Sequence, residues 1–365
     1  MLELQVRARL DAPHTAPFVI KVLGENEAAP VTAQPQELAF IRDQRDGEVE
    51  IDTHWGVLTL SGTDASFIGD VLFVDPISGI AQRWFRRGDT QNTLLITERC
   101  DQLCVMCSQP PKKSHTDYFA HFERACLLAD ANADIGLSGG EPTLFKDQIF
   151  SLVRNVVTRR ADIRFHILTN AQHFQRSDIE TLHALRGDIV WGVPVYSSNP
   201  ATHDQLVGKL GAFERLEASL GLLYEANAAI EIRTVLMRQT IGGLGALARW
   251  LSARLCDANC WAIMQLEKQG FAKGRWDDQF FDHSTDFTAV GDAISMALAQ
   301  GLDTLLYNVP RCTVPAEFRD LCPSTISDWK RDYRPECQAC NAKSLCSGLF
   351  AWHGDTHPYA HWGTL

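Results

Sequence analysis

Three cysteines with the spacing C-x3-C-x2-C are the residues of this chain best suited to metal chemistry: Cys100, Cys104 and Cys107. The short apolar run Leu94-Leu95-Ile96 lies just before them and predicts a buried strand, so the thiols follow a strand's C-terminal end. Three thiolates in one compact loop can hold three irons of a 4Fe-4S cluster and leave the fourth iron open to another ligand. From spacing alone, a zinc site with a distant fourth ligand and buried free cysteines remain alternatives.

A second motif follows the next predicted strand, Asp134 to Ser138, where the chain continues Gly139-Gly140-Glu141-Pro142-Thr143. Paired glycines at a strand exit let the backbone approach a ligand closely. This Gly-Gly-Glu-Pro motif lies about one helix's length beyond the cysteines. The two motifs together resemble the radical S-adenosylmethionine (radical SAM) superfamily.

The resemblance implies roles for both motifs. The three cysteines would hold the cluster, and Gly139, Gly140, Glu141 and Pro142 would bind the amino group of the methionine moiety of S-adenosylmethionine. In the superfamily the residue before the third cysteine is usually aromatic and packs near the adenine. Here it is Met106, whose soft side chain can fill that role.

Strands and helices alternate from Asn92 onward, which predicts βα units, a parallel sheet and right-handed crossovers. We expect strands at 93–97, 134–138, 163–169, 188–196, 230–236 and 261–266, and helices at 118–131, 146–158, 178–185, 213–226 and 244–253. Six units would make a partial (β/α)6 TIM barrel, an α/β fold whose chemistry gathers at the C-terminal ends of the strands.

The same rule selects polar residues at other strand ends: Asn170, Ser197 with the nearby His203-Asp204, Arg233, and Gln265 with Glu267. By resemblance, such groups contact the ribose hydroxyls and the methionine carboxylate, and Arg233 could supply a forked cation for the latter. Each has a structural alternative. Asn170 could cap a turn, Arg233 could form an ion pair, and His203-Asp204 could begin a helix.

A second group of cysteines follows Gly301, where a final strand and turn lead into Cys312. The group comprises Cys312, Cys322, Cys337, Cys340 and Cys346, the last three spaced C-x2-C-x5-C. It resembles part of the auxiliary-cluster motif in SPASM and Twitch extensions of peptide-modifying radical enzymes. The resemblance implies a second, auxiliary 4Fe-4S cluster, with Cys312 as the natural fourth ligand and Cys322 spare or in its place. Four thiolates suit a structural zinc equally well.

The remaining cysteines and a run of histidines carry weaker signals. We expect Cys126, Cys256 and Cys260 to be buried small hydrophobic residues. His353, His357 and His361 recur every fourth residue, but Pro358 would interrupt a helix that aligned them, so we expect a tail and no metal site.

The first 90 residues contain short β-prone runs. They lie at 18–23, 48–51, 56–60, 69–74 and 81–85, with a hairpin turn at 75–79. We predict a small β domain at 1–90, a radical SAM barrel at 91–300 and a cysteine-rich extension at 301–365. The β domain could pack on the barrel, or an exposed strand edge could take up a peptide by β-augmentation.

Composition limits the partners. The net charge is 34 − 45 = −11 and no Lys/Arg-rich run stands out, so nucleic acid is an unfavourable partner. Eleven cysteines without a signal peptide or a transmembrane-length apolar run indicate a cytoplasmic protein, away from membranes, whose thiols serve metals.

A closer resemblance is to the His-Xaa-Ser system radical SAM maturases of the HxsC family. It rests on Asn92 to Cys100, Cys107 to Lys112, the region of Glu267, and Ser327 to Lys330, and it extends from the β domain to about Phe350. The resemblance implies a ribosomally synthesised substrate peptide with His-Xaa-Ser repeats, a sister radical SAM maturase, and an electron donor such as flavodoxin or ferredoxin.

The predicted function is therefore reductive cleavage of S-adenosylmethionine to a 5′-deoxyadenosyl radical that abstracts hydrogen from a peptide. Epimerisation, a carbon-carbon crosslink or an ether could follow, and Cys322 could donate a hydrogen atom in an epimerisation. Two alternatives stay open. One is a radical SAM enzyme that modifies a small molecule or nucleoside, and the other is a non-catalytic iron-sulfur or zinc module.

Overall fold

The computed structural model describes residues 4–24, 27–63, 65–354 and 356–365. The chain divides into two compact units. The unit called here the N-terminal unit comprises Leu2–Thr97 and His115–Ile167, and the C-terminal unit comprises Glu98–Ser114 and Leu168–Leu365.

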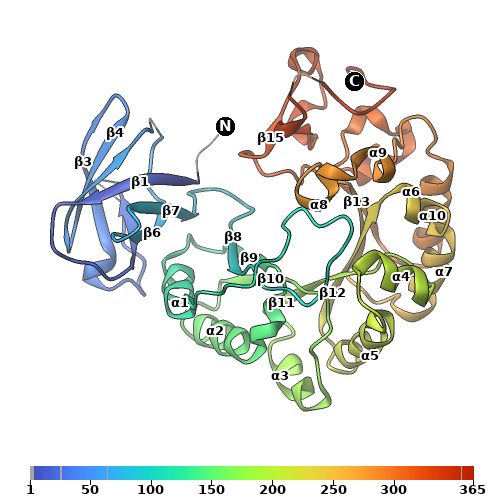
Figure 1. Cartoon of the computed structure of the whole chain (residues 1–365), viewed down its shortest axis with the longest axis horizontal. Helices are drawn as coiled ribbons and strands as arrows, with labels where there is room; N and C mark the ends of the chain where they lie inside the picture. Colours follow the sequence, from blue (N-terminus) through green and yellow to red (C-terminus); the bar gives the residue numbers. More distant parts are fainter. Residues whose placement is uncertain (1–3, 25–26, 64, 355) are drawn as a thin grey trace. The chain divides into compact units, whose positions relative to one another are not determined.

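A closed barrel of seven strands forms the first part of the N-terminal unit (Figure 1). The strands are β1 (Gln5–Leu10), β2 (Phe18–Leu23), β3 (Leu38–Arg45), β4 (Glu48–Thr53), β5 (Gly56–Ser61), β6 (Val71–Asp75) and β7 (Ile80–Phe85). Neighbours are antiparallel except β2 and β3, and the pairing of β1 with both β5 and β7 closes the ring. Ile20, Ile51 and Leu58 are fully buried in its core. The five predicted β runs are present, whereas β1 and β3 were not predicted.

Closure of the barrel removes the strand edge that β-augmentation requires. Each of the seven described strands has a neighbour on both sides. A closed ring presents no row of unpaired backbone groups to an incoming peptide. The alternative of peptide docking by strand addition at this domain is therefore wrong.

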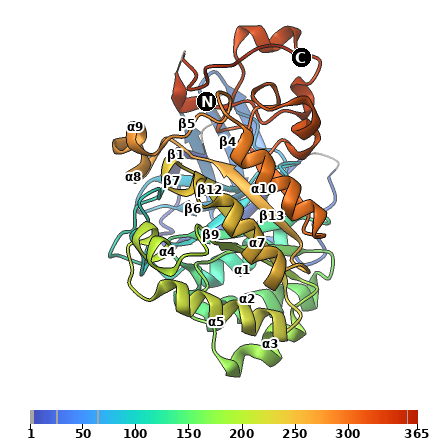
Figure 2. The ribbon, with the colours of Figure 1, turned by 90° about the vertical axis from the view of Figure 1, so that its right-hand side faces the viewer.

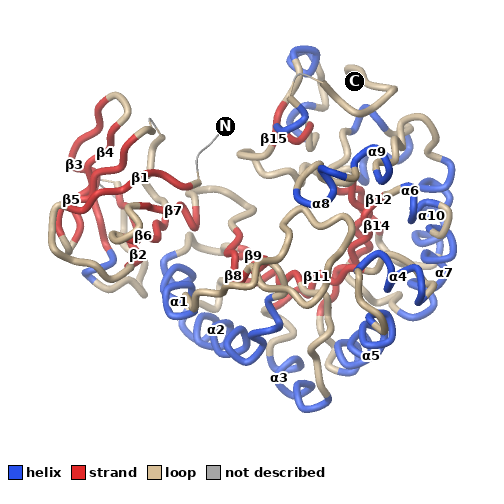
Figure 3. The backbone as a smooth tube through the Cα atoms, viewed as in Figure 1, coloured by secondary structure: helices blue, strands red, loops and turns tan. Residues whose placement is uncertain are grey.

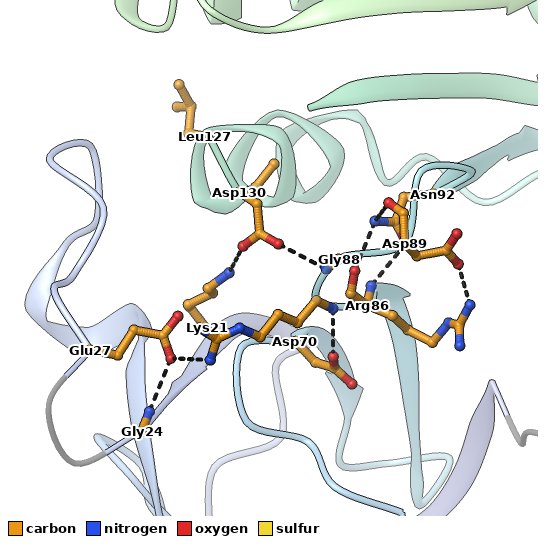
Figure 4. A network of polar contacts seen from close by, with 12 residues as sticks. Lys21, Gly24, Glu27, Asp70, Arg86, Gly88, Asp89, Asn92, Leu127 and Asp130 are labelled. Atoms are coloured by element: carbon orange, nitrogen blue, oxygen red, sulfur yellow. Dashed lines mark hydrogen bonds and ion pairs between the residues drawn. The ribbon is translucent and has the colours of Figure 1, made fainter. Parts of the chain in front are cut away.

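Ion pairs fix the barrel to helix α1 (Phe119–Leu128) of the same unit. Figure 4 shows Asp130, just beyond α1, between the Lys21 ammonium and the Gly88 amide, at 2.7 Å and 3.2 Å from its two carboxylate oxygens. Arg124 donates from Nε and Nη2 to the two carboxylate oxygens of Glu37. Lys21 is only 3% exposed, so these contacts belong to a packed interface. The barrel packs on the helix, in line with the structural role we weighed against docking.

The N-terminal unit also contains the first strands of the parallel sheet. They are β8 (Thr93–Thr97), β9 (Asp134–Gly139) and β10 (Arg164–Leu168), whose last residue lies in the C-terminal unit. β9 pairs in parallel with β8 and with β10. Helix α1 lies between β8 and β9 in the chain, and α2 (Lys146–Arg159) lies between β9 and β10. Ile135, Leu137 and Ile167 are fully buried, whereas the residues that alternate with them are partly exposed, so one face of these strands is buried more deeply than the other.

The C-terminal unit continues the alternation of strands and helices, which Figure 3 shows in red and blue. Its parallel strands are β11 (Ile189–Pro194), β12 (Ala229–Leu236), β13 (Cys260–Gln265) and β14 (Thr304–Tyr307). Its helices are α3 (Ile179–Ala184), α4 (Pro200–Val207), α5 (Ala212–Glu225), α6 (Arg238–Ile241), α7 (Leu244–Arg254), α8 (Gly270–Gly274), α9 (Trp276–Gln279) and α10 (Thr288–Ala299). Figure 2 shows α10 beside α7, and the two helices are in contact.

Two features of this unit differ from the sequence prediction. The strand that we assigned to a separate extension, β14, pairs in parallel with β13 from Trp261↔Thr304 to Met264↔Tyr307 and so lengthens the sheet. Helices α4 and α10 were not predicted. For α4 the local signals are clear, because Asn199 accepts from the Thr202 amide at its N-terminus and Gly208 adopts a left-handed conformation at its end. The partial (β/α)6 barrel stays a prediction.

Residues 311–365 contain little regular structure. Two short strands, β15 (Arg331–Asp332) and β16 (Leu349–Phe350), pair antiparallel, and the other described residues of this region form short 3-10 helices, turns and loops. In the part of the chain that the structure describes, no helix is both long enough and apolar enough to span a bilayer.

Candidate metal centres

The loop that leaves β8 carries the first cysteine motif. Cys100, Cys104 and Cys107 are all partly exposed. Burial, with the neighbouring sulfurs of Cys100 and Cys107, raises the pKa of the Cys104 thiol to about 12. The three sulfurs therefore share one environment, in which thiolates repel each other. A bound cation would reverse this balance, because it stabilises the charged thiolate.

The end of helix α4 fixes the backbone of this loop from one side. The Leu103 amide donates to the Val207 carbonyl at 3.0 Å, and the Val105 amide donates to the Leu206 carbonyl at 2.9 Å. Gly208 has a φ of +65°, and a Cβ there would lie 2.8 Å from the Leu103 carbonyl oxygen. The close approach of the two segments therefore requires glycine at this position.

The segment after β13 fixes the same loop from another side. The Phe271 amide donates to the Cys107 carbonyl at 2.8 Å, and Arg275 and Gln279 both donate to the Val105 carbonyl at 3.1 Å. Each of these contacts reaches backbone atoms of the cysteine loop. The path of the loop is thus fixed by residues distant in sequence.

Asp101, the residue after the first cysteine, connects the loop to the exit of β10. Its carboxylate accepts a hydrogen bond from Asn170 at 2.7 Å, contacts His173 at 3.3 Å and forms an ion pair with Lys209. Burial opposes the charge of Asp101, but the hydrogen bonds from His173, Lys209 and Asn170 hold its pKa below the usual range. The Asn170 side chain is thus engaged in the loop itself, and its predicted ribose contact stays a prediction.

An apolar cluster lies beneath the cysteine loop. Met106 is 6% exposed and belongs to a cluster that also contains Leu206, Met237 and Leu266, with Cys104 and Tyr196 packed against it. Burial and the nearby Cys104 and Cys107 sulfurs raise the pKa of Tyr196. Met106 is therefore a packing residue of the loop, and its contact with an adenine stays a prediction.

The Gly-Gly-Glu-Pro motif closes the end of β9 in the N-terminal unit. Gly139 has a φ of +135°, and a Cβ there would lie 2.1 Å from the Thr97 carbonyl oxygen. The Gly140 amide donates to that same oxygen at 2.7 Å. Only glycine permits this approach to the last residue of β8.

Glu141 and Pro142 begin a 3-10 turn, Pro142–Phe145. Glu141 is 1% exposed, and its carboxylate accepts from the Thr143 amide at 2.8 Å and from the Thr143 hydroxyl. The carboxylate therefore caps the turn. Its part in binding an amino group stays a prediction.

The other strand-end residues have protein partners. Ser197 accepts from the Asn199 amide at 3.0 Å ahead of α4, and His203-Asp204 lies within α4. Arg233 donates to Glu231 at 2.9 Å, which is the ion pair that we considered as its structural alternative. Glu267 lies 3.8 Å from the Lys330 ammonium, and burial raises the pKa of this carboxyl while Lys330 lowers it. Lys330 thus connects the end of β13 to the C-terminal extension.

A pocket in the C-terminal extension brings together four of the predicted cysteines. Cys312, Cys337, Cys340 and Cys346 all line it, together with Trp362 and others. The nearby Cys346 and Cys337 sulfurs contribute to raising the pKa of Cys312, after burial, to about 11. Four sulfurs around one space are a donor set for an iron-sulfur cluster or for zinc.

Backbone amides point at the sulfurs of this pocket. Cys346 accepts from the Arg311 and Gly348 amides, each at 3.4 Å, and Cys340 accepts from the Leu365 amide at 3.4 Å. Backbone hydrogen bonds from Gly363 to Cys312 and from Arg334 to Cys337 lower the pKa values of those two thiols against the effect of burial. Cys340 and Cys346 thus accept N–H groups at 3.4 Å, and the Gly363 and Arg334 amides lie close enough to Cys312 and Cys337 to favour the thiolate form that metals bind.

Cys322 differs from these four residues. It is fully buried and does not line the pocket, and its thiol donates to the Phe318 carbonyl at 3.7 Å. Burial raises its pKa to about 12. This environment favours the protonated thiol, and the hydrogen-donor role we predicted for Cys322 stays a prediction.

Side chains in neither cysteine group converge on one point. Among the residues that the structure describes, no three His, Cys, Asp or Glu are already arranged to hold a metal ion. The fit of the C-terminal group rests on its shared pocket and its N–H donors. The fit of the first group rests on the common environment of its sulfurs and the fixed path of its loop.

The remaining cysteines correct one prediction. Cys126 is fully buried as expected, but Cys256 is exposed and Cys260 is partly exposed. Cys256 lies just beyond the end of α7, in a turn at the surface, which is why it escapes burial. Cys260 lies 4.0 Å from Glu231.

Several residues that organise the first site had little signal in the sequence. Asp101 and Lys209 meet only in the folded chain, and Gly208 and Gly270 matter only through the backbone that they approach. The one usable clue was the position of Asp101 between two cysteines of the motif.

Comparison with known proteins identifies the domain that contains both motifs. Residues 94–251 match the family model described as the Radical SAM superfamily. This match confirms the prediction of a radical SAM enzyme domain. A curated relative, the AdoMet-dependent heme synthase of Methanosarcina barkeri, is 31% identical over 157 residues, which cover 40% of this chain and 42% of that protein. The chain thus matches less than half the length of this relative.

The comparison with solved structures found partial matches with TM-scores below 0.5. Streptococcus suis SuiB bound to S-adenosylmethionine has a TM-score of 0.48 and 17% identity, over 59% of this chain and 49% of SuiB. SuiB bound to the precursor peptide SuiA gives the same TM-score and identity over 59% and 48%. Native anSMEcpe with bound AdoMet has a TM-score of 0.46 and 14% identity, over 74% and 92% of the two chains.

Proposed function

We propose that this chain, which carries a radical SAM domain at residues 94–251, reductively cleaves S-adenosylmethionine and abstracts hydrogen from a ribosomally synthesised peptide. The observation that carries the first part is the cysteine loop after β8. Residues of α4, α8 and α9 fix its backbone, and its three sulfurs share one environment.

In this proposal Cys100, Cys104 and Cys107 hold a 4Fe-4S cluster with one open iron. When bound, the cluster and S-adenosylmethionine supply electron transfer and a carbon-centred radical, which is chemistry that side chains cannot provide. The protein holds the loop and shields it on its buried side with the cluster around Met106.

The pocket of Cys312, Cys337, Cys340 and Cys346 supports the second part of the proposal. Its four sulfurs, each with an N–H donor, suit an auxiliary 4Fe-4S cluster. Such a cluster in a cysteine-rich extension is the feature that the sequence shares with peptide-modifying radical enzymes. The Glu267–Lys330 contact attaches this extension to the C-terminal end of β13, where chemistry is expected.

The finer substrate assignment follows the resemblance to HxsC-type maturases. In this proposal the substrate is a peptide with His-Xaa-Ser repeats, the partner is a sister radical SAM maturase, and the electron donor is flavodoxin or ferredoxin. A cytoplasmic location belongs to the same proposal.

A second candidate function is a radical reaction on a small molecule. The curated relative named AdoMet-dependent heme synthase, at 31% identity, is the observation that favours it. In that case the C-terminal cysteines would bind a structural metal such as zinc.

Iron, sulfide and zinc content, with 5′-deoxyadenosine release under a strong reductant, tests these proposals. The samples are anaerobically reconstituted wild type and a Cys100/Cys104/Cys107→Ala triple variant, with the exposed Cys256→Ala as matched control. We expect about eight irons per chain in wild type and in the control, and about half of that in the triple variant. The triple variant should release no 5′-deoxyadenosine.

Two other outcomes would change the proposal. About four irons in wild type and none in the triple variant would leave one cluster and move the proposal to the small-molecule reaction. Two clusters without any cleavage of S-adenosylmethionine would contradict the radical SAM activity itself.

A further inference from the structure

Residues 359–365 lie outside both cysteine motifs, and they reach the C-terminal pocket. Trp362, Gly363 and Leu365 line this pocket together with the four cysteines. The Leu365 amide donates to the Cys340 sulfur at 3.4 Å, and Gly363 lines the pocket beside Cys312, where its amide lowers the pKa of that thiol against the effect of burial. Two of the four sulfurs therefore take their N–H donor from this segment.

The segment is fixed before it reaches the pocket. The Ala360 amide donates to the Asp282 carboxylate at 2.7 Å, and the His361 amide donates to the Ser284 hydroxyl at 3.0 Å. Tyr359 is 5% exposed and packs against His283 and Phe280, with ring centroids 5.1 Å and 6.0 Å away. These contacts fix the direction in which residues 362–365 continue.

A further backbone contact holds the far end. The Asn341 amide donates to the Leu365 carbonyl at 3.0 Å, directly beside Cys340. Leu365 thus contacts the 340–341 turn through both its amide and its carbonyl group. Trp362 also packs against the apolar cluster that contains Met106 and Tyr359. The segment is therefore an ordered wall of the pocket.

Hydrogen bonds to cysteine sulfur change the properties of an iron-sulfur cluster. An N–H donor withdraws charge from a thiolate, stabilises the more negative reduced state and so raises the reduction potential. The donors at Cys337 and Cys346 come from within the extension, at Arg334, Arg311 and Gly348. Those at Cys312 and Cys340 depend on residues 363 and 365.

We infer that residues 362–365 are a positioning segment of the C-terminal metal site, whose Gly363 and Leu365 amides raise the reduction potential of an auxiliary cluster bound by Cys312, Cys337, Cys340 and Cys346. This inference rests on the proposed function, because it requires iron at that site. It assigns a role to a segment that carries neither motif.

Proline removes one amide hydrogen, so paired substitutions isolate the donors. Gly363→Pro and Leu365→Pro lose the N–H group, whereas Gly363→Ala and Leu365→Ala keep it. The alanine control at 363 fits, because a Cβ there meets nothing within 4 Å. Each variant is made in the full chain with the Cys100/Cys104/Cys107→Ala background, so that EPR-monitored redox titration follows the auxiliary cluster alone.

We expect each proline variant to keep its iron and to have a more negative potential than its alanine partner. A chain without residues 363–365 tests the case in which proline prevents cluster assembly, and it should show the largest negative shift. In the background chain, pulsed ENDOR of the reduced cluster should find exchangeable amide protons, fewer of them in the shortened chain.

Equal potentials in the proline, alanine and shortened chains, with no change in the exchangeable protons, would overturn the inference while leaving the auxiliary cluster in place. Zinc or no metal at the site in the triple-cysteine background would overturn both the inference and the auxiliary cluster. Neither result would contradict cleavage of S-adenosylmethionine by the wild-type chain, which is measured separately as release of 5′-deoxyadenosine.

Discussion

The two cysteine groups are built in opposite ways. Cys100, Cys104 and Cys107 lie within one loop, and the amide beside the Cys107 sulfur comes from Gln109 in that same loop. The four C-terminal cysteines span residues 312–346, and their N–H donors come from residues 311, 334, 348, 363 and 365. In the first group the sulfurs are close together because their cysteines are close in sequence. In the second group the folding of the extension brings the sulfurs together.

This difference separates two kinds of sensitivity. The first group needs its loop held in place, which residues of α4, α8 and α9 do through backbone atoms. The second group needs the extension folded before its sulfurs meet. Substitutions in the residues that contact the loop should therefore weaken metal binding at the first group. At the C-terminal site, metal binding should be weakened by substitution of each of the four cysteines.

The largest expected effect comes from comparing Cys312→Ala with Cys322→Ala. Cys312 lines the pocket and accepts the Gly363 amide, while Cys322 is buried outside it and donates to Phe318. We expect Cys312→Ala to lose the iron of one cluster, about four irons per chain, and Cys322→Ala to lose none. Iron and sulfide analysis after reconstitution measures both.

The pair also tests the two roles left for Cys322. If Cys322→Ala lost a cluster and Cys312→Ala kept it, the ligand assignment would be reversed. If Cys322→Ala kept both clusters and all product formation, the hydrogen-donor role would be excluded.

The next effect concerns the first group and the close contact at Gly270. Its φ is +55°, and a Cβ would lie 2.4 Å from the Cys107 carbonyl oxygen. We expect Gly270→Ala to lower the free energy of unfolding by about 2–4 kcal/mol, because both the strained backbone and the clash must be relieved. Displacement of the loop should also reduce the iron bound by Cys100, Cys104 and Cys107. This iron is measured in a chain that also carries Cys312→Ala, because that substitution should remove the iron of the C-terminal site.

Gly274, at the other end of α8, is the matched control. A Cβ there meets nothing within 4 Å, so Gly274→Ala should leave stability and iron content unchanged or slightly improved. A similar loss of iron in both variants would show that α8 as a whole, and not the contact with Cys107, holds the loop.

The sequence predicted the first group better than the surroundings of either group. The C-x3-C-x2-C spacing and the Gly-Gly-Glu-Pro strand end are local patterns, and their domain is confirmed by the match at residues 94–251. The strands around them were predicted within a few residues, because short buried β runs between helices are readable locally.

What the sequence could not predict depends on contacts between distant segments. Closure of the N-terminal barrel depends on the pairing of β1 with β7, and the role of Asp101 depends on Lys209. The exposure of Cys256 was missed because the sequence alone does not distinguish a cysteine in a surface turn from a cysteine in the core. The donors at 363 and 365 are backbone atoms, which residue type does not reveal.

A smaller effect is expected at Asp101. Asp101→Asn keeps the shape of the side chain but removes the charge that faces Lys209 and His173. We expect the free energy of unfolding to fall by about 1–3 kcal/mol, because partly buried donors lose a charged acceptor. Thermal unfolding of the anaerobic holoprotein measures the change.

Glu98→Gln is the control for this prediction, since Glu98 lies in the same loop and pairs with Lys112 at the surface, 2.7 Å apart. An exposed pair contributes at most about 1 kcal/mol. Equal losses in the two variants would mean that Asp101 is an ordinary surface charge, and the connection to the exit of β10 would then not stabilise the loop.

The effect that is smallest at neutral pH should be the same in both regions, because a buried histidine lies near each. His203 accepts from the Tyr196 amide beside the first group, and His283 lies between Gln265 and Thr313, next to Cys312. Burial lowers the pKa of each histidine to about 4, against the opposing effect of a neighbouring aspartate. Both rings are therefore neutral in the folded protein near neutral pH.

Because the unfolded chain takes up these protons near pH 6.5 and the folded chain does not, the stability is complete above about pH 6.5 and falls as the pH decreases toward 4. Each histidine should cost up to about 1.4 kcal/mol per pH unit in that window. His203→Gln and His283→Gln should each make unfolding less dependent on pH between about 7 and 5. If only one of the two variants changed the pH dependence of unfolding, only one cysteine region would contain a buried neutral histidine.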